Sequence, residues 1–345
     1  MKKLWLWLLP LLLLGACMPN NDDEVLIPVY RNGLVHVDSL GQVEFLPDPE
    51  ISRTALSVER LPDGRVLLIH DSLHIYNPET QELSHITPTG HYSYYSPPGH
   101  DLSPDGNKLY HNSLGSIRSL DLTTNHSELH AVADWDCYVR PVISKDGRYL
   151  TYLQSSDGIY STSHSGGYPI IKDLLSGTYT DLSSGNAATD HDITYAMKSI
   201  NSELIYYISD HTLMVMDMQG NNRTAVRDNV SYVVESSDGR FMLCFDSYFY
   251  SSGYLSYRDN QSMTWYQLPL MHESQLCRSA NILYYVYNKS LIKVDLTSGV
   301  QTTIFSNTLE GRKINNIDCI APSWDGKDVV AFVRFQTWEN SKYPL

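Results

Sequence analysis

Short apolar runs alternate with polar turns along almost the whole chain. The stretch at residues 103–122 illustrates the unit: a Ser-Pro-Asp-Gly turn at 103–106 precedes an apolar run at 108–111, and a second run at 117–122 follows a short loop. This pattern predicts turn, strand, loop, strand and turn. No stretch shows sustained 3.6-residue periodicity, so we expect essentially no helix after residue 16.

A turn of the type Ser-x-Asp-Gly, followed by an apolar or aromatic strand, recurs along the chain. The aspartate carboxylate can accept a local backbone N–H, and glycine supplies a positive φ. An Asp-Gly pair between apolar runs is also a strong signal for a β-hairpin. Clear copies occupy residues 61–64, 103–106, 144–147, 236–239 and 323–326, and degenerate copies lie at 199–202 and 279–281.

A second signal alternates with the first. It is an apolar strand that ends in Asp or Asn and is followed by a polar turn. Its copies end at Asp38, Asn77, Asp121, Asp173, Asp217, Asp259 and Asp295. Each signal occurs seven times, at spacings mostly between 36 and 52 residues. This period, with four short strands per unit, is typical of a β-propeller blade.

The order of the copies predicts how the ring closes. The chain begins with a second signal that has no first, and it ends with a first signal that has no second. One blade would therefore take its inner strands from the C-terminus and its outer strands from the N-terminus, near Val330 and Val35. We predict an all-β fold, a single propeller of seven four-stranded blades over residues 25–345. Six or eight blades remain open because two copies are degenerate.

The Ser-Pro-Asp-Gly turn followed by two strands, the second ending in Asp-Leu, resembles the WD40-like propeller repeats found in TolB. Similar repeats occur in the propellers of prolyl-oligopeptidase-type peptidases. The resemblance covers residues 25–340 at the level of the repeat, and such repeats serve many functions. The chain has neither the separate α/β domain of TolB nor a Gly-x-Ser-x-Gly nucleophile motif. The resemblance therefore implies a propeller without implying the activities of these proteins.

The N-terminus carries an export signal. Two lysines precede eleven apolar residues at 4–14, too few to span a bilayer, which indicates a signal peptide. The following Leu-Gly-Ala-Cys, ending at Cys17, resembles the bacterial lipobox. We predict a signal peptide at 1–16 and a lipidated Cys17 with an acidic tether at 17–24. The predicted location is the bacterial outer membrane, lipid-anchored, with the periplasmic and cell-surface sides both open.

The net charge of −14 argues against nucleic acid as a partner. The remaining cysteines, Cys137, Cys244, Cys277 and Cys319, lie in different repeats within apolar strands. We expect buried free thiols at these positions, although an oxidising compartment would permit disulfides. No cysteine spacing of a metal site is present, and we expect no cofactor.

Candidate binding residues concentrate in the irregular connections. In a propeller the a–b and c–d turns share one face, and the b–c and d–a connections share the other. The latter are rich in Tyr, His, Ser and Asp, and long loops on a rigid scaffold are the usual place for recognition. The alternative is that Tyr, with 25 copies, is simply this chain's favoured strand residue. The candidate ligand-binding residues are His91, Tyr92, Tyr94, Tyr95, His100, Trp135, Arg140, Tyr160, His164, His191 and Tyr248.

Polar residues on the expected inner strands could bind a ligand or pair with one another, and we expect pairing. They are His100, Asp101, Arg140, Arg278 and Asp318. The first functional hypothesis is a non-enzymatic binding or scaffold module for a protein or glycan. The alternative is a metal-dependent polysaccharide lyase, because oligogalacturonate lyases are propellers with similar repeats. His100, His164 and His191 would then line the channel mouth. A purely structural component is the third reading.

Overall fold

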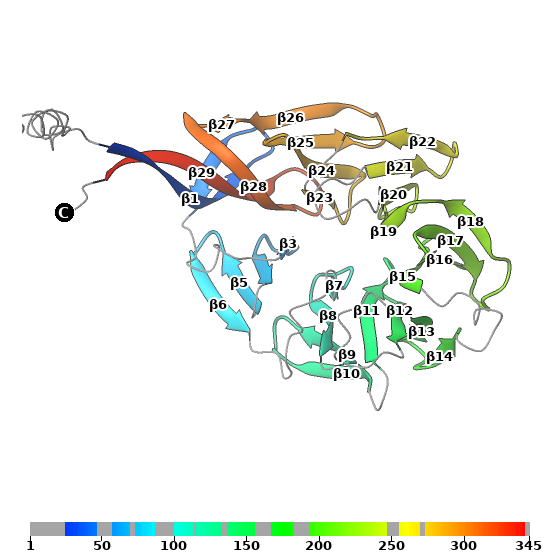
Figure 1. The fold of residues 1–345 in the computed structure, drawn as a ribbon. Coiled ribbons are helices and arrows are strands. Elements are labelled where there is room, and N and C mark those ends of the chain that lie inside the picture. The colour runs from blue at the N-terminus through cyan, green and yellow to red at the C-terminus, as the bar shows by residue number, and fades with distance from the viewer. Residues whose placement is uncertain are drawn as a thin grey trace, which may run out of the picture.

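Seven four-stranded blades form a ring around a central channel (Figure 1). The computed structural model describes residues 25–46, 57–69, 73–86, 100–113, 115–132, 137–155, 167–182, 193–246, 255–269 and 273–341. These residues form strands and turns and no helix, so none of them makes a helix that could cross a membrane. The predicted all-β class is confirmed.

Five blades are separate antiparallel sheets whose strands run in chain order from the channel outwards. Blade 1 has β3 (Ser57–Arg60), β4 (Val66–Ile69), β5 (Leu73–Asn77) and β6 (Glu82–Ile86). Blade 2 has β7 (His100–Leu102), β8 (Lys108–Ser113), β9 (Ser116–Asp121) and β10 (Ser127–Ala131). Blade 3 has β11 (Cys137–Ile143), β12 (Tyr149–Ser155), β13 (Tyr168–Asp173) and β14 (Tyr179–Asp181). Blade 4 has β15 (Ile193–Lys198), β16 (Leu204–Ser209), β17 (Thr212–Asp217) and β18 (Thr224–Arg227). Blade 5 has β19 (Val230–Glu235), β20 (Phe241–Asp246), β21 (Leu255–Asp259) and β22 (Thr264–Gln267).

The last two blades share one nine-stranded sheet. Blade 6 has β23 (Glu273–Leu276), β24 (Ile282–Tyr287), β25 (Ser290–Asp295) and β26 (Gln301–Ser306). The short β27 (Thr308–Leu309) joins it to blade 7, which has β28 (Arg312–Pro322), β29 (Val329–Ser341), β1 (Val25–Val37) and β2 (Val43–Leu46). Within blade 7, Val35 lies opposite Ala331 and His36 opposite Val330. The predicted closure, with inner strands from the C-terminus and outer strands from the N-terminus, is confirmed, as is the count of seven.

The Ser-x-Asp-Gly turns are held together by their own side chains. At the copy that begins at Ser103, the serine hydroxyl donates to Asp105 Oδ1 at 2.5 Å and accepts from the backbone N–H of Lys108 at 2.9 Å. Gly106 adopts a φ of +70°, and a Cβ there would overlap Pro62 of the neighbouring blade. Each turn is therefore both a hairpin closure and a contact between blades. The serine donates in the same way at Ser144, Ser236 and Ser323.

The second signal forms the turn between the third and fourth strands of each blade. The carboxylate of Asp121 accepts the backbone N–H groups of Thr123 at 2.9 Å and Thr124 at 2.7 Å. Because the strand's last side chain satisfies the next backbone donors, the turn needs no other support. Equivalent bonds are made by Asp38, Asn77, Asp173, Asp217, Asp259 and Asp295.

The turn of blade 6 differs from its predicted frame. The Cys277 N–H donates to the Ile282 carbonyl at 2.8 Å, as that of Ser103 does to Lys108 at 2.8 Å. The sixth copy therefore begins at Cys277, two residues before the predicted start. Cys277 stands in place of the serine and Ala280 in place of the glycine, so this copy does not match the Ser-x-Asp-Gly pattern in the sequence. This frame places Arg278 at the second turn position.

The core lies between neighbouring blades rather than in one central mass. Leu67 and Leu73 of blade 1, for example, pack with Leu102 and Leu109 of blade 2, and all four side chains are fully buried. Cys244, Cys277 and Cys319 belong to such clusters as buried thiols that form no disulfide, as predicted. The side chains of Cys17 and Cys137 lie outside the described residues.

Candidate functional site

The strand order separates the two faces of the ring. All a–b and c–d turns lie on one face, the turn face, and all of them are described. The b–c and d–a connections leave from the opposite face, the loop face. Nine of the eleven predicted ligand-binding residues belong to b–c or d–a connections. All nine lie outside the described residues: His91, Tyr92, Tyr94, Tyr95, Trp135, Tyr160, His164, His191 and Tyr248.

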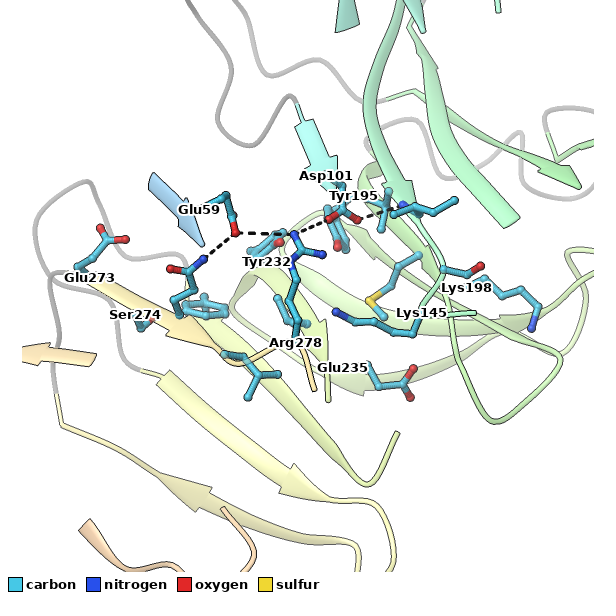
Figure 2. A pocket seen from close by; sticks show the side chains of 18 of the residues that line it. Glu59, Asp101, Lys145, Tyr195, Lys198, Tyr232, Glu235, Glu273, Ser274 and Arg278 are labelled. Carbon is cyan, nitrogen blue, oxygen red and sulfur yellow. Dashed lines mark hydrogen bonds and ion pairs between the residues drawn. The ribbon is translucent and has the colours of Figure 1, made fainter. Parts of the chain in front are cut away.

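The described part of the channel contains a cavity of about 230 Å³ (Figure 2). The inner strands of blades 1 to 6 line it. Its charged lining residues are Glu59, Asp101, Lys145, Lys198, Glu235, Glu273 and Arg278, and its aromatic ones are Tyr195, Tyr232 and Phe245. Charged groups in such a channel can bind a ligand or pair with one another. Their hydrogen bonds show which of them are already paired.

Arg278 crosses the channel from blade 6 to blades 1 and 2. Its guanidinium donates to Asp101 Oδ1 at 3.2 Å and to the Leu102 carbonyl at 3.0 Å, and it lies 3.8 Å from Glu59 Oε2. Asp101 also accepts the Ile143 N–H of blade 3 at 3.1 Å. Figure 2 shows this chain of contacts as dashed lines. Four blades are thereby joined at the turn-face end of the channel.

The same network controls the charge state of Glu59. Burial raises the pKa of this carboxyl, while the positive charge of Arg278 acts to lower it. The Gln275 side-chain amide also donates to Glu59 Oε2 at 2.9 Å. Glu59 and Asp101 in turn raise the pKa of Arg278 against the opposing effect of its burial, so the guanidinium stays charged. The expected pairing of Asp101 with Arg278 is confirmed.

Lys145 is a channel cation that the sequence patterns did not single out. It stands at the second position of the blade 3 turn, as Arg278 does in blade 6. The other blades carry Pro62, Pro104, Ile200, Ser237 and Trp324 at this position. Burial and the charge of Arg278 lower the pKa of Lys145, while Asp101 and Glu59 raise it. The available signal was a charged residue at a turn position where most copies are uncharged.

Two further carboxyls line the cavity with different surroundings. Glu235 is bonded to the neighbouring turn, where it accepts from Ser199 Oγ at 2.9 Å and from the Ile200 N–H at 2.8 Å. Glu273, at the start of β23, pairs with Val286 through its backbone, but its carboxyl makes no hydrogen bond or ion pair with another described residue. Burial, with a smaller effect of Glu59, raises the pKa of Glu273 to about 7. Glu235 is therefore part of the contact between blades 4 and 5, whereas the carboxyl of Glu273 makes no such contact with a described residue.

His100 and Arg140 are the two predicted ligand-binding residues that the structure describes, and neither lines the cavity. Burial lowers the pKa of His100 to about 4, so its imidazole is neutral at pH 7. Arg140 has a φ of +55° in a bulge of β11, and its guanidinium donates to the Thr194 carbonyl of blade 4. It holds two blades together instead of pairing with an inner-strand acid. Asp318 pairs with Arg334 at 3.1 Å.

The described residues contain no group of three or more His, Cys, Asp or Glu side chains placed to hold a metal ion. Two of the three histidines of the lyase hypothesis, His164 and His191, lie outside the described residues. The metal hypothesis therefore stays a prediction.

Fold, closure and channel define the chain as a seven-bladed β-propeller. No family model matches the sequence, and no curated protein matches it. Among solved structures, an oligogalacturonate lyase in complex with manganese matches with a TM-score of 0.59 at 12% identity, covering 90% of this chain and 98% of that one. The tricorn protease matches with a TM-score of 0.57 at 12% identity, covering 85% of this chain and 36% of that one. At such identities the likeness concerns the fold alone.

Proposed function

We propose that the protein is a lipid-anchored β-propeller of the bacterial envelope, with TolB-like repeats, that binds a protein or glycan through its loop face. The division of the two faces carries the proposal. The turn face consists of short turns that satisfy their own hydrogen bonds, and Arg278 crosses the channel behind it. The long connections, rich in Tyr and His, all leave from the other face. Tyrosine combines an apolar ring with a hydroxyl at low entropic cost, which suits recognition.

The geometry of blade 7 relates this face to the proposed anchor. β1 starts, and β29 ends, at the loop face, where residues 25–29 and 337–341 pair only with each other. The pair projects from the ring as a ribbon (Figure 1). At about 3.3 Å per residue, five residues extend about 17 Å. An anchor at Cys17 would therefore attach on the side of the loop face, which would be turned toward the membrane.

Binding is tested with the purified protein on an array of envelope and plant glycans and by capture from envelope extract. Replacing Tyr92 and Tyr94 by Ala should weaken a bound ligand at least about tenfold, since stacking on aromatic side chains contributes about 1 kcal/mol or more per ring. Tyr179→Ala is the matched control, because this tyrosine is 71% exposed on the outermost strand of blade 3. Equal losses in both variants would contradict a loop-face site.

Anchoring is tested separately. The wild-type protein should fractionate with membranes and carry acyl chains at Cys17 in mass spectra, whereas Cys17→Ser should be released or retain its leader. An unacylated wild-type Cys17 would disprove the anchor without touching the binding proposal.

A metal-dependent polysaccharide lyase is the second candidate, supported by the fold likeness to the manganese-bound oligogalacturonate lyase and by the neutral imidazole of His100. It predicts that manganese stimulates release of unsaturated products from polygalacturonate, and that His191→Ala abolishes this release. Failure of the wild-type protein to produce them with added manganese would remove this candidate.

A further inference from the structure

The inner strands arrange the lining of the channel in layers. Tyr195, Tyr232 and Glu273 each stand four residues before the turn of their blade, and no bulge interrupts their strands between the residue and the turn. Because the inner strands run from the loop face to the turn face, these side chains form one layer on neighbouring blades 4, 5 and 6, on the loop-face side. Lys145 and Arg278 belong to the turns themselves. The channel therefore has cations at its turn-face end and a carboxyl beside aromatic rings nearer the loop face.

Carboxyls outnumber cations in the described lining of the cavity. Four carboxyls face it, those of Glu59, Asp101, Glu235 and Glu273, against the three cations Lys145, Lys198 and Arg278. Arg278 is engaged with Asp101 at 3.2 Å and Glu59 at 3.8 Å. The carboxyl of Glu273 forms no hydrogen bond or ion pair with another described residue. A carboxylate withdrawn from water without a partner is costly, so this position is suited to receive a cation.

The neighbours of Glu273 also favour a cation. Gln275 lies two residues further along β23, on the same face of the strand, and donates to Glu59 Oε2 at 2.9 Å. Glu59 is close enough for its charge to act on Glu273 and raise the pKa of that carboxyl. Figure 2 shows Glu59 between Glu273 and Arg278. The described residues include no group of three His, Cys, Asp or Glu side chains placed to hold a metal ion, which favours an organic cation.

The rest of this layer is apolar. The rings of Tyr195 and Tyr232 meet edge to face with centroids 4.8 Å apart, and Phe245, opposite Tyr232 in the blade, lies 5.5 Å from it. Aromatic rings are favourable neighbours for both methylene groups and an ammonium. At about 230 Å³ the cavity is smaller than the roughly 300–1,000 Å³ of pockets for drug-sized ligands, so it admits a single side chain. An ammonium on a four-carbon stem, the side chain of lysine, combines these features.

We propose that the channel receives a lysine side chain of a protein bound at the loop face, with its ammonium on Glu273 and its methylene stem against Tyr232 and Phe245. This inference rests on the loop-face binding proposed above and specifies the partner as a protein. The net charge of −14 attracts a basic partner. Lys145 and Arg278 at the turn-face end repel a second cation, which holds the incoming ammonium at the layer of Glu273.

The test is NMR titration of the full-length protein at pH 8 with the blocked tripeptide Gly-Lys-Gly. The same peptide with norleucine keeps the stem and lacks the ammonium. The lysine peptide should bind at least about tenfold more tightly, because a charge-assisted hydrogen bond forms only with the ammonium. Glu273→Gln should remove this preference. Glu82→Gln should keep it, and this variant is the matched control because Glu82 is exposed on the outermost strand of blade 1.

The lysine preference should also depend on pH. Since the pKa of Glu273 is about 7, lowering the pH from 8 to 6 protonates its carboxyl and should weaken the lysine peptide but not the norleucine peptide. Glu273→Gln should abolish this dependence. That result separates Glu273 from the ionisable groups around it, Glu59 on β3 and Cys319 on β28.

Three results would overturn the inference. The two peptides bind equally; or the lysine preference survives in Glu273→Gln; or glucosamine binds more tightly than the lysine peptide, which would make the occupant an amino sugar. Circular dichroism spectra and unfolding midpoints of the variants exclude misfolding as the cause of a loss.

The double variant Tyr92→Ala/Tyr94→Ala separates the two proposals. It should keep the lysine preference even though it loses the ligand of the loop face. If that ligand depends on Tyr92 and Tyr94 while the wild-type protein shows no lysine preference, the channel inference fails and the loop-face proposal stands.

Discussion

Replacing Arg278 by Met should destabilise the propeller because it leaves the carboxylates of Asp101 and Glu59 in the channel without their cationic partner. Methionine keeps most of the aliphatic length beside Trp324, whose ring centre lies 5.9 Å from the guanidinium carbon. What is lost is the bond to Asp101 at 3.2 Å, the bond to the Leu102 carbonyl at 3.0 Å and the ion pair with Glu59 at 3.8 Å.

The magnitude follows from burial. The side chains of Arg278, Asp101 and Glu59 are only 18%, 23% and 16% exposed. Removing one partner of a buried ion pair costs about 3–5 kcal/mol, and partial solvent access favours the lower end of this range. We expect the free energy of unfolding to fall by about 3 kcal/mol.

The assay is urea unfolding followed by tryptophan fluorescence, with Arg334→Met as the matched control. Arg334 makes a similar bond to Asp318, at 3.1 Å, but its side chain is 41% exposed, so its loss should cost less than about 1 kcal/mol. Asp101→Asn in the Arg278→Met background should recover part of the deficit. Equal losses in the two arginine variants, or no recovery, would refute the reasoning.

The deficit of the Arg278→Met variant should also depend on pH. Since Arg278 acts to lower the pKa of Glu59, its removal raises that pKa further above the ordinary value of 4.5. A carboxyl with a raised folded-state pKa gains stability as pH falls, because the folded protein then binds the proton more tightly. The difference from the wild-type protein should shrink as the pH is lowered toward 4.5, and a constant difference would contradict this mechanism.

Three further predictions address the scaffold. Gly106→Ala should lower the free energy of unfolding by more than about 2 kcal/mol, because it forces a Cβ into the neighbouring turn. Gly177→Ala, with a similar φ of +73° but open space around the added Cβ, should lower it by about 1 kcal/mol. Urea unfolding midpoints measure both changes. Val35→Ala should cost about 2 kcal/mol in the same assay, because this fully buried residue of the N-terminal strand belongs to the core of the closing blade, and no loss would mean that closure contributes nothing. The buried thiols of Cys244 and Cys319 should resist iodoacetamide in the native protein and react after unfolding, and rapid native labelling would argue against their burial.

The repeat was predictable from the sequence because its determinants are local. The bonds of the Ser103 turn join residues at most five positions apart, so the residues that define the turn also stand together in the sequence. The closure of the ring was predictable because the two unpaired signals at the chain ends complement each other. The frame of the sixth copy was missed because Cys277 and Ala280 fill a turn whose backbone bond persists without the usual side chains.

The channel network could not be predicted in the same way. Arg278 meets Asp101 across 177 positions of sequence, and their distance depends on how seven blades close. Arg140 shows the same limit: its bulge turns the guanidinium toward Thr194 rather than toward an inner-strand acid. Lys145 looked like one more polar turn residue. Local patterns thus predicted the scaffold, whereas the charges in the channel are paired by tertiary structure.

The pKa of Glu273 tests most directly whether the carboxyl at the start of β23 lies in a buried channel. Carbon-13 NMR of protein labelled at glutamate, with Glu273→Gln for assignment, gives this value. We predict a pKa of about 7, because burial and the nearby charge of Glu59 disfavour the carboxylate. A pKa near the ordinary 4.5 would contradict the burial of this carboxyl in the channel.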